Sequence, residues 1–320
     1  MLRNESLRRP AQACAALAAL IGALVLQACP APHPSSSPCP PADGARRIVS
    51  LAPSITESLL FISPDLAARL VGVTSFDDAP ELKNTARVGG YSAFSSEAIA
   101  ALRPDLILAE ETSLTQARLD ELARLGLCVR TLPLKTVSQT LEAIAEAGRL
   151  AGMTLEGERA ARRLRENLAK SSQRAQPLER RPRAVVLIGW EPPTAAGPDT
   201  FAGEILTMAG ADSALPSSPI PYPVLTAEAL LALKLDLMVD AAHGPPGPAE
   251  AFLELARQAG SPPVHVRAGE ALLRPGPHLA EASEMLSERI WEAFGPRTGG
   301  DPGPSTPPQQ PPQKPDPSDR

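Results

Sequence analysis

The stretch SSEAIAALRPDLILA (Ser95–Ala109) recurs in altered form as TAEALLALKLDLMVD (Thr226–Asp240), 131 positions further along the chain. Each copy has the pattern of a short helix that starts at a Ser or Thr, then a turn, then an apolar strand. The gap-free alignment pairs Glu97 with Glu228, Ala98 with Ala229, Leu102 with Leu233, Asp105 with Asp236, and Arg103 with Lys234. A unit repeated at the spacing of one lobe predicts two lobes of the same kind.

Around both copies, short β-like runs alternate with helical ones. The expected strands are 47–51, 71–74, 105–109, 128–131, 183–188, 235–239 and 264–267. The expected helices are 95–102, 116–125, 200–209, 228–233, 249–260 and 279–294, with another started by a capping box at Ser54–Glu57. Strands separated by helices imply parallel βαβ units.

The segment 138–168 is helical in pattern, with a break near Gly152, and is the natural bridge between the lobes. The sequence therefore predicts an α/β fold of two Rossmann-like lobes joined by a long bridging helix. The folded domain covers 46–295, with lobes at about 46–150 and 182–295 and the bridge at about 154–174.

Both ends of the chain differ in composition from this middle part. Three arginines precede an apolar run at Ala13–Leu26 that is too short to span a bilayer, which predicts a secretory signal peptide at 1–28. The sequence Leu26-Gln27-Ala28-Cys29 resembles the bacterial lipoprotein box, so Cys29 is the expected lipidation site; ordinary cleavage after Ala28 is the alternative. We expect a lipid-anchored protein on the periplasmic side of the cell envelope.

Proline-rich segments flank the folded domain. Residues 29–45 are rich in Pro and Ser and predict an extended tether, and 296–320 predict a disordered tail. Of the four cysteines, Cys128 opens an apolar run and is interpreted as a buried small hydrophobe. A bridge between Cys39 and Cys128 stays open, because an oxidising compartment permits it while a tether gives no geometric reason for it.

The composition narrows the class of protein. A formal net charge of −5 and 3% aromatic residues argue against a nucleic-acid binder. No Gly-x-Gly-x-x-Gly, P-loop or Gly-x-Ser-x-Gly motif is present. The first lobe contains no histidine that could activate Ser50, Ser54 or Ser92. We therefore do not expect an enzyme. His243, His265 and His278 all lie in the second lobe, and no metal site is expected. A purely structural lipoprotein remains the third hypothesis.

The two repeated glutamates have a structural and a functional interpretation. Glu97 and Glu228 follow N-cap residues, and an acid in a first helical turn interacts favourably with the helix dipole. That interpretation does not explain why Tyr91 and Tyr222 recur six residues upstream, in loops of the kind that bind ligands in α/β proteins. The pattern indicates one ligand held between the lobes and one partner that touches both.

The chain resembles the solute-binding proteins of bacterial ABC importers for cobalamin and ferric siderophores. The resemblance runs from about residue 46 to about 294. It is carried by RIVSLAPSITESLLFI (Arg47–Ile62), VGVTSFDDAP (Val71–Pro80), RVGGYSAFSSEAIAALRPDLILA (Arg87–Ala109) and PYPVLTAEALLALKLDLMV (Pro221–Val239). It implies the helical-backbone periplasmic binding protein fold, a ligand in the cleft, and an importer permease with its ATPase as partners.

The resemblance also implies roles for individual residues. Glu97 and Glu228 match the glutamates that dock on permease arginines, and Phe76, Tyr91 and Tyr222 match cleft aromatics of the cobalamin-binding members. The loop Glu270, Ala271, Leu272, Leu273 and Arg274 matches a further ligand-binding segment. The implied cargo is a corrinoid, with no resident cofactor; a ferric siderophore or haem, for which Tyr91 could ligate iron, is the alternative.

Two regions depart from the pattern of the cobalamin-binding members, namely the residues after the strand 105–109 and the family's acidic-aromatic loop, which has become Glu270-Ala271-Leu272 here. Where a relative carries an aromatic after the strand 105–109, this chain has Glu110 and Glu111. A corrin ring offers a large flat face that favours stacking aromatics, so this loss bears on the cargo. Trp190, which follows a strand, either restores an aromatic in the cleft or belongs to the core.

Overall fold

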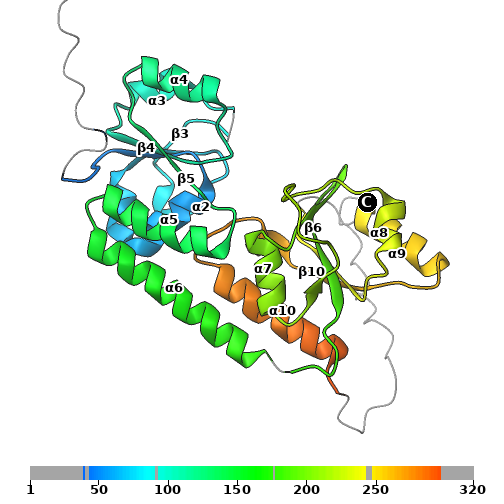
Figure 1. Ribbon diagram of the computed structural model, residues 1–320. Coiled ribbons are helices and arrows are strands. Elements are labelled where there is room, and N and C mark those ends of the chain that lie inside the picture. The colour runs from blue at the N-terminus through cyan, green and yellow to red at the C-terminus, as the bar shows by residue number, and fades with distance from the viewer. Residues whose placement is uncertain (1–38, 40–42, 91–92, 176, 243–246, 297–320) are drawn as a thin grey trace, which may run out of the picture.

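The computed structural model describes residues 39, 43–90, 93–175, 177–242 and 247–296 (Figure 1). The expected signal peptide, the lipidation site Cys29, nearly all of the tether, Tyr91, His243 and the Pro-rich tail from 297 lie outside the described residues. No helix among the described residues combines the length and apolar composition needed to cross a bilayer.

The N-terminal lobe is built on a five-stranded parallel sheet of order β3-β2-β1-β4-β5. Its strands are β1 (Ile48–Ser50), β2 (Leu70–Val73), β3 (Ala86–Arg87), β4 (Leu106–Glu110) and β5 (Val129–Leu132). Its helices are α2 (Pro53–Ile62), α3 (Ser96–Ala101), α4 (Gln116–Arg124) and α5 (Val137–Leu150), with 3-10 turns at Pro64–Arg69 and Pro80–Leu82. Because side chains alternate along a strand, α3 and α4 pack on one face of the sheet and α2 and α5 on the other.

The C-terminal lobe repeats this plan with one change. Its sheet has the order β10-β9-β6-β7, and β8 also pairs with β6. The strands are β6 (Arg183–Trp190), β7 (Pro193–Ala196), β8 (Asp212–Ser213), β9 (Leu237–Asp240) and β10 (Val264–Arg267). The helices are α7 (Phe201–Met208), α8 (Ala227–Ala232), α9 (Gly247–Gln258) and α10 (Leu279–Phe294), with a 3-10 turn at Gly269–Leu272. Strand β7 is antiparallel, whereas the other pairs are parallel.

The two lobes are joined by α6 (Thr154–Arg174), a helix of 21 residues that is about 32 Å long. It packs against α5 of the first lobe and α10 of the second, and Figure 1 shows it running along both. A Cβ added to Gly148 would lie 2.6 Å from the Cα of Gly157, so these two glycines let α5 and α6 pack closely. The expected break lies between α5 and α6, where Gly152 has a positive φ of 70°.

One expectation was wrong, and one alternative that the sequence left open is decided. The helix after β1 begins at Pro53, with Ala52 at the N-cap and no side-chain cap, because proline is preorganised for the first helical position. Ser54 and Glu57 therefore lie inside the helix rather than forming a capping box. Cys128 is not a free thiol: it forms a disulfide with Cys39, whose Cα atom lies 5.4 Å from its own. Arg130 donates a hydrogen bond of 2.6 Å to the carbonyl of Cys39, so this part of the tether is held against β5.

Candidate functional site

The repeated glutamates occupy equivalent places in the two lobes. Glu97 lies in the first turn of α3, where the Ser95 hydroxyl accepts a hydrogen bond of 3.1 Å from the backbone N–H of Ala98. Glu228 lies in the first turn of α8, where Thr226 caps the helix in the same way. Both carboxylates are exposed, and hydrogen bonds from its own backbone N–H and from Thr226 lower the pKa of Glu228.

The turns after α3 and α8 are also equivalent. Arg103 and Lys234 have positive φ values of 48° and 50°, the left-handed conformation in which L side chains are strained. These two residues are the only non-glycine positions with positive φ among the described residues. The repeat in the sequence is therefore a repeat in backbone conformation.

An arginine and an aspartate then tie each repeat to the first strand of its sheet. In the N-terminal lobe, Asp105 accepts a hydrogen bond of 3.0 Å from the backbone N–H of Arg47, whose guanidinium donates to the carbonyl of Leu102 at 2.6 Å. In the C-terminal lobe, Asp236 accepts one of 2.8 Å from the N–H of Arg183. We call each Arg–Asp pair, Arg47 with Asp105 and Arg183 with Asp236, a clasp.

The clasp of the C-terminal lobe has a further member that the sequence interpretation missed. Arg183 donates through Nε to the carbonyl of Leu233 at 3.2 Å, whereas Arg47 reaches the equivalent carbonyl of Leu102 through Nη2. Arg180 adds two hydrogen bonds to the Asp236 carboxylate, at 2.8 and 2.9 Å, and this contact lowers the pKa of that carboxyl. The clasps fix α3 and α8 to their sheets, so the two exposed glutamates stand on rigid supports.

Glu110 of the N-terminal lobe and Tyr222 of the C-terminal lobe are coupled electrostatically. Glu110 is the last residue of β4, and burial raises the pKa of its carboxyl. Burial and then the charge of Glu110 raise the pKa of Tyr222 to about 12. This coupling links the end of β4 in one lobe with the segment before α8 in the other.

Tyr222 is held in place by its backbone neighbours. The N–H of Gly197 donates to the carbonyl of Pro221 at 2.8 Å, and the N–H of Ala195 donates to that of Pro223 at 3.0 Å. The segment thus extends along β7, and the half-buried Tyr222 side chain packs against the main core. The backbone of β7 therefore positions the segment that carries Tyr222.

A second contact between the lobes involves the predicted ligand-binding loop. Arg274, which precedes α10, donates a hydrogen bond of 2.9 Å to Oε1 of Glu57 on α2. Both side chains are only about one-fifth exposed. Burial raises the pKa of Glu57, and the contact with Arg274 partly offsets this. Within the described residues, Oε2 of Glu57 is buried and has no hydrogen-bond partner.

The other residues predicted to bind a ligand differ in exposure, and some of them are buried in the core. Phe76 follows β2 and is 55% exposed. Leu272 is fully buried, because the 3-10 turn before α10 directs it into the core, so its side chain does not face a ligand in this structure. Ala271 and Leu273 are half-buried against the same core. Only the backbone of Glu270 is described.

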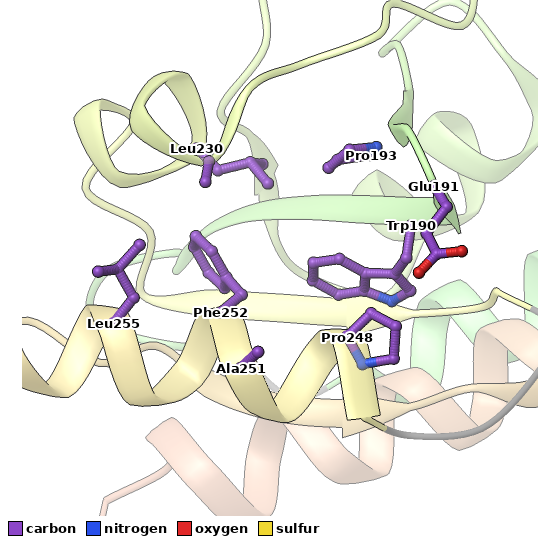
Figure 2. A pocket seen from close by; sticks show the side chains of 9 residues that line it. Trp190, Glu191, Pro193, Leu230, Pro248, Ala251, Phe252 and Leu255 are labelled. Atoms are coloured by element: carbon purple, nitrogen blue, oxygen red, sulfur yellow. The ribbon is translucent and has the colours of Figure 1, made fainter.

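Trp190 lies in a pocket of the C-terminal lobe, on the side of α8 and α9 (Figure 2). The pocket has a volume of about 320 Å³ and is lined by Trp190, Glu191, Pro193, Ala227, Leu230, Pro248, Ala251, Phe252 and Leu255. The indole Nε1 donates to the buried carboxylate of Asp240 at 3.1 Å, and the Trp190 ring lies 6.0 Å from that of Phe252. The contacts with Asp240 and Phe252 therefore hold the Trp190 side chain in this pocket.

Comparison with known proteins assigns the chain to a family. The model of the family described as periplasmic binding protein matches residues 48–252, which is most of both lobes. The chain belongs to the periplasmic binding protein family. Membership agrees with the resemblance stated above and implies an extracytoplasmic location.

Individual relatives agree with this assignment. The vitamin B12-binding protein of Yersinia pestis (strain Pestoides F) is 28% identical over 203 residues, which cover 62% of this chain and 70% of the relative. The periplasmic vitamin B12 binding protein BtuF of Vibrio cholerae has a similar structure, with a TM-score of 0.65 and 24% identity over 78% of this chain and 98% of that one.

A periplasmic heme binding protein from Pseudomonas aeruginosa is equally similar in structure, with a TM-score of 0.65 and 23% identity over 78% of this chain and 94% of that one. At these identities the solved structures show the fold alone. They confirm the two-lobed α/β fold, and the relatives of this periplasmic binding protein are binding proteins rather than enzymes. Among the described residues, no group of three or more His, Cys, Asp or Glu side chains is arranged to hold a metal ion.

Proposed function

We propose that this periplasmic binding protein captures a corrinoid between its lobes and delivers it to the permease and ATPase of an ABC importer. The observation that carries the proposal is the duplicated unit: each lobe presents one exposed glutamate on a short helix fixed by an Arg–Asp clasp. Two equivalent acids at fixed positions suit a partner that offers a basic group to each lobe.

The docking acids are Glu97 and Glu228. Exposed charges of this kind increase the association rate through long-range attraction, and they contribute little to the stability of the free protein. Their first-turn position also favours the charged form, because the helix dipole stabilises an anion there. The partner chemistry we propose is therefore a pair of arginines on the membrane permease.

The cleft favours a corrinoid over haem as cargo. A corrin carries amide groups around its rim, and Glu110 offers them a half-buried carboxyl that accepts hydrogen bonds. The carboxylates of a haem would instead be repelled by the negative charge of Glu110. Tyr222, with a pKa of about 12, keeps its proton and is a poor source of the phenolate that binds iron. A ferric siderophore or haem stays the alternative, with Tyr91 as the iron ligand.

The membrane anchor is part of the proposal. Lipidation of Cys29 would hold the protein at the periplasmic side of a membrane, with the Pro-rich segment 29–45 as spacer. Metabolic labelling with a fatty acid tests this directly, since wild-type protein should incorporate label and the Cys29→Ser variant should not. Labelling of both, or of neither, would refute the anchor without affecting the cargo assignment.

The cargo is tested by incubating the purified protein with cyanocobalamin or haemin, followed by gel filtration and an absorbance spectrum. We expect corrin absorbance to co-elute with the protein in near-stoichiometric amount. Co-elution of haem alone would replace the corrinoid by the alternative cargo, and retention of neither, together with a negative siderophore panel, would favour a structural lipoprotein.

Docking is tested by reversing both acids, Glu97→Arg with Glu228→Arg. We expect loss of transport with corrinoid affinity nearly unchanged. The matched control is Glu158→Arg with Glu288→Arg, which alters the net charge equally at two exposed helical sites. A large loss of affinity in the first variant would place these acids in the cleft, and an equal loss of transport in the control would show that overall charge, not docking, is responsible.

A further inference from the structure

The pocket around Trp190 has the chemistry of a site for proline-rich peptide. Its walls are two aromatic rings, two prolines and aliphatic side chains, with Glu191 exposed at its rim (Figure 2). The hydrogen bond from Trp190 to Asp240 fixes the indole, and Leu255 is 41% exposed at the pocket's edge. A preformed aromatic surface of this kind binds polyproline II segments, which lose little entropy on docking.

Proline also suits the apolar lining of the pocket. It carries no backbone N–H, so burying it against apolar walls leaves no donor without a partner. A polar or charged segment would pay a desolvation cost there that the lining side chains do not compensate. A proline-rich segment is therefore compatible with the apolar lining of this pocket.

The chain itself contains such a segment beyond the described residues. The sequence PPQQPPQKP spans 307–315 and holds two Pro-x-x-Pro units, the second with Lys314 inside it. Among the described residues, Glu191 forms no ion pair, and it offers Lys314 a carboxylate. We propose that the second unit, residues 312–315, binds as a polyproline II helix in the Trp190 pocket of the same molecule.

The length of the connecting chain permits this. The described part ends at Pro296, just after α10, and ten residues, 297–306, lead to the proline segment. Helix α10 lies on the face of the C-terminal sheet opposite α8 and α9, so the two helix layers are about 20 Å apart. Trp190 ends β6, whereas Ser287 of α10 bonds to Ala209 near the start of that strand, so the chain must also travel about 26 Å along the sheet. The fifteen residues 297–311 reach about 50 Å when extended, which lets the second Pro-x-x-Pro unit, residues 312–315, pass around the edge of the sheet.

The fluorescence of Trp190 reports on the pocket once the second tryptophan is removed by Trp291→Phe. In that background, the full chain is compared with a variant in which the prolines at 307, 308, 311, 312 and 315 are alanine. The matched control replaces Pro302, Pro304 and Pro317 instead. Iodide quenching measures how exposed the indole is.

A tether of this length supplies an effective concentration of about 1 mM. With a dissociation constant of about 0.3 mM for the free peptide, the pocket is covered about three-quarters of the time, so the proline-to-alanine variant should show about fourfold stronger quenching. The control variant should match wild type. Equal quenching in all three chains would overturn the proposal. The proposal would also be overturned if quenching of the proline-to-alanine variant decreased as the protein concentration increased, because a second copy would then fill the pocket.

A synthetic peptide of residues 304–320 provides the second measurement. Added to the proline-to-alanine variant, it should restore protection saturably, and Leu255→Glu in the pocket should weaken it about tenfold. Leu125→Glu, at a leucine of the other lobe that is 49% exposed, is the control and should leave it unchanged. A Lys314→Glu peptide should bind up to about fivefold more weakly. Peptide binding that ignores both Leu255 and the prolines would overturn the assignment.

Discussion

Arg274 is the residue for which the family resemblance and the structure differ most. The resemblance places it among ligand contacts, whereas the structure gives it a hydrogen-bonded ion pair with Glu57 of the other lobe, at 2.9 Å. Replacing it by methionine keeps much of the apolar length and removes the charge. We expect this variant to fold less stably even without a ligand.

The size of the effect follows from the burial of the pair. Removing one partner of a fully buried pair costs about 3–5 kcal/mol, whereas an exposed pair is worth about 0–1 kcal/mol. With both side chains about one-fifth exposed, we expect Arg274→Met to lower the free energy of unfolding by about 2 kcal/mol near pH 7.5. For a unit of this size that is a fall in Tm of about 4–8 °C.

The pH dependence of the variant identifies the cause. Burial raises the pKa of Glu57 above its ordinary value of 4.5, so in the absence of Arg274 the carboxyl can take up a proton. The cost of Arg274→Met should therefore shrink as the pH falls toward 5. A double-mutant cycle with Glu57→Gln, read by thermal unfolding in corrinoid-free buffer, should give a coupling energy of about 1–2 kcal/mol.

Three results would refute this reasoning. A coupling energy near zero would mean that the two side chains act independently. A cost that is the same at pH 5 and pH 7.5 would exclude uncompensated charge on Glu57 as its origin. Unchanged stability together with a large loss of corrinoid affinity would return Arg274 to the ligand site, as the family resemblance implies.

Other perturbations test separate parts of the structure. Burial raises the pKa of Glu110 from 4.5, so the folded protein binds that proton more tightly than the unfolded chain does. The protein therefore loses stability as the pH rises from 4.5 through the folded pKa. In Glu110→Gln, the melting temperature should depend less on pH over this range. Cys128→Ser opens a covalent loop with a sequence separation of 89 and should cost about 3 kcal/mol in denaturant unfolding, matched by reduction of the wild type. Lys234→Gly and Arg103→Gly relieve positive φ and should each stabilise the fold by about 0.5 kcal/mol, whereas Gly126→Ala, at φ 72°, should destabilise it by about 1 kcal/mol. A stabilising Gly126→Ala would contradict the φ argument.

Patterns of local sequence were sufficient to predict the fold. Alternating strands and helices, the break before α6 and the closing helix α10 were each predicted, because apolar periodicity and N-cap residues determine them locally. The start of α2 was placed wrongly because Ser54-x-x-Glu57 matches a capping box, while the proline that begins the helix was not weighed. The Ser-x-x-Glu pattern alone does not show whether the helix begins at the serine or at the proline before it.

Contacts between distant segments explain the remaining differences. The pairing of Cys39 with Cys128 requires that the tether return to β5, which no short motif reveals. The ion pair between Glu57 and Arg274 and the approach of Glu110 to Tyr222 both depend on how the two lobes face each other. The recurrence of an arginine at the start of β1 and of β6, Arg47 and Arg183, was a usable signal for the clasps, and it was overlooked.

The clasps give this unit the same arrangement in both lobes, although the two sheets differ in the antiparallel strand β7. Each clasp holds the end of a short helix at the edge of the sheet where the strands begin, and a helix in a βαβ unit runs antiparallel to its strands. The other end of that helix, which carries Glu97 or Glu228, therefore points toward the edge where the strands finish. That is also the edge with Glu110 and with the loops that reach the cleft. An equivalent attachment at one edge of each sheet thus places an exposed acid toward the opposite edge in both lobes.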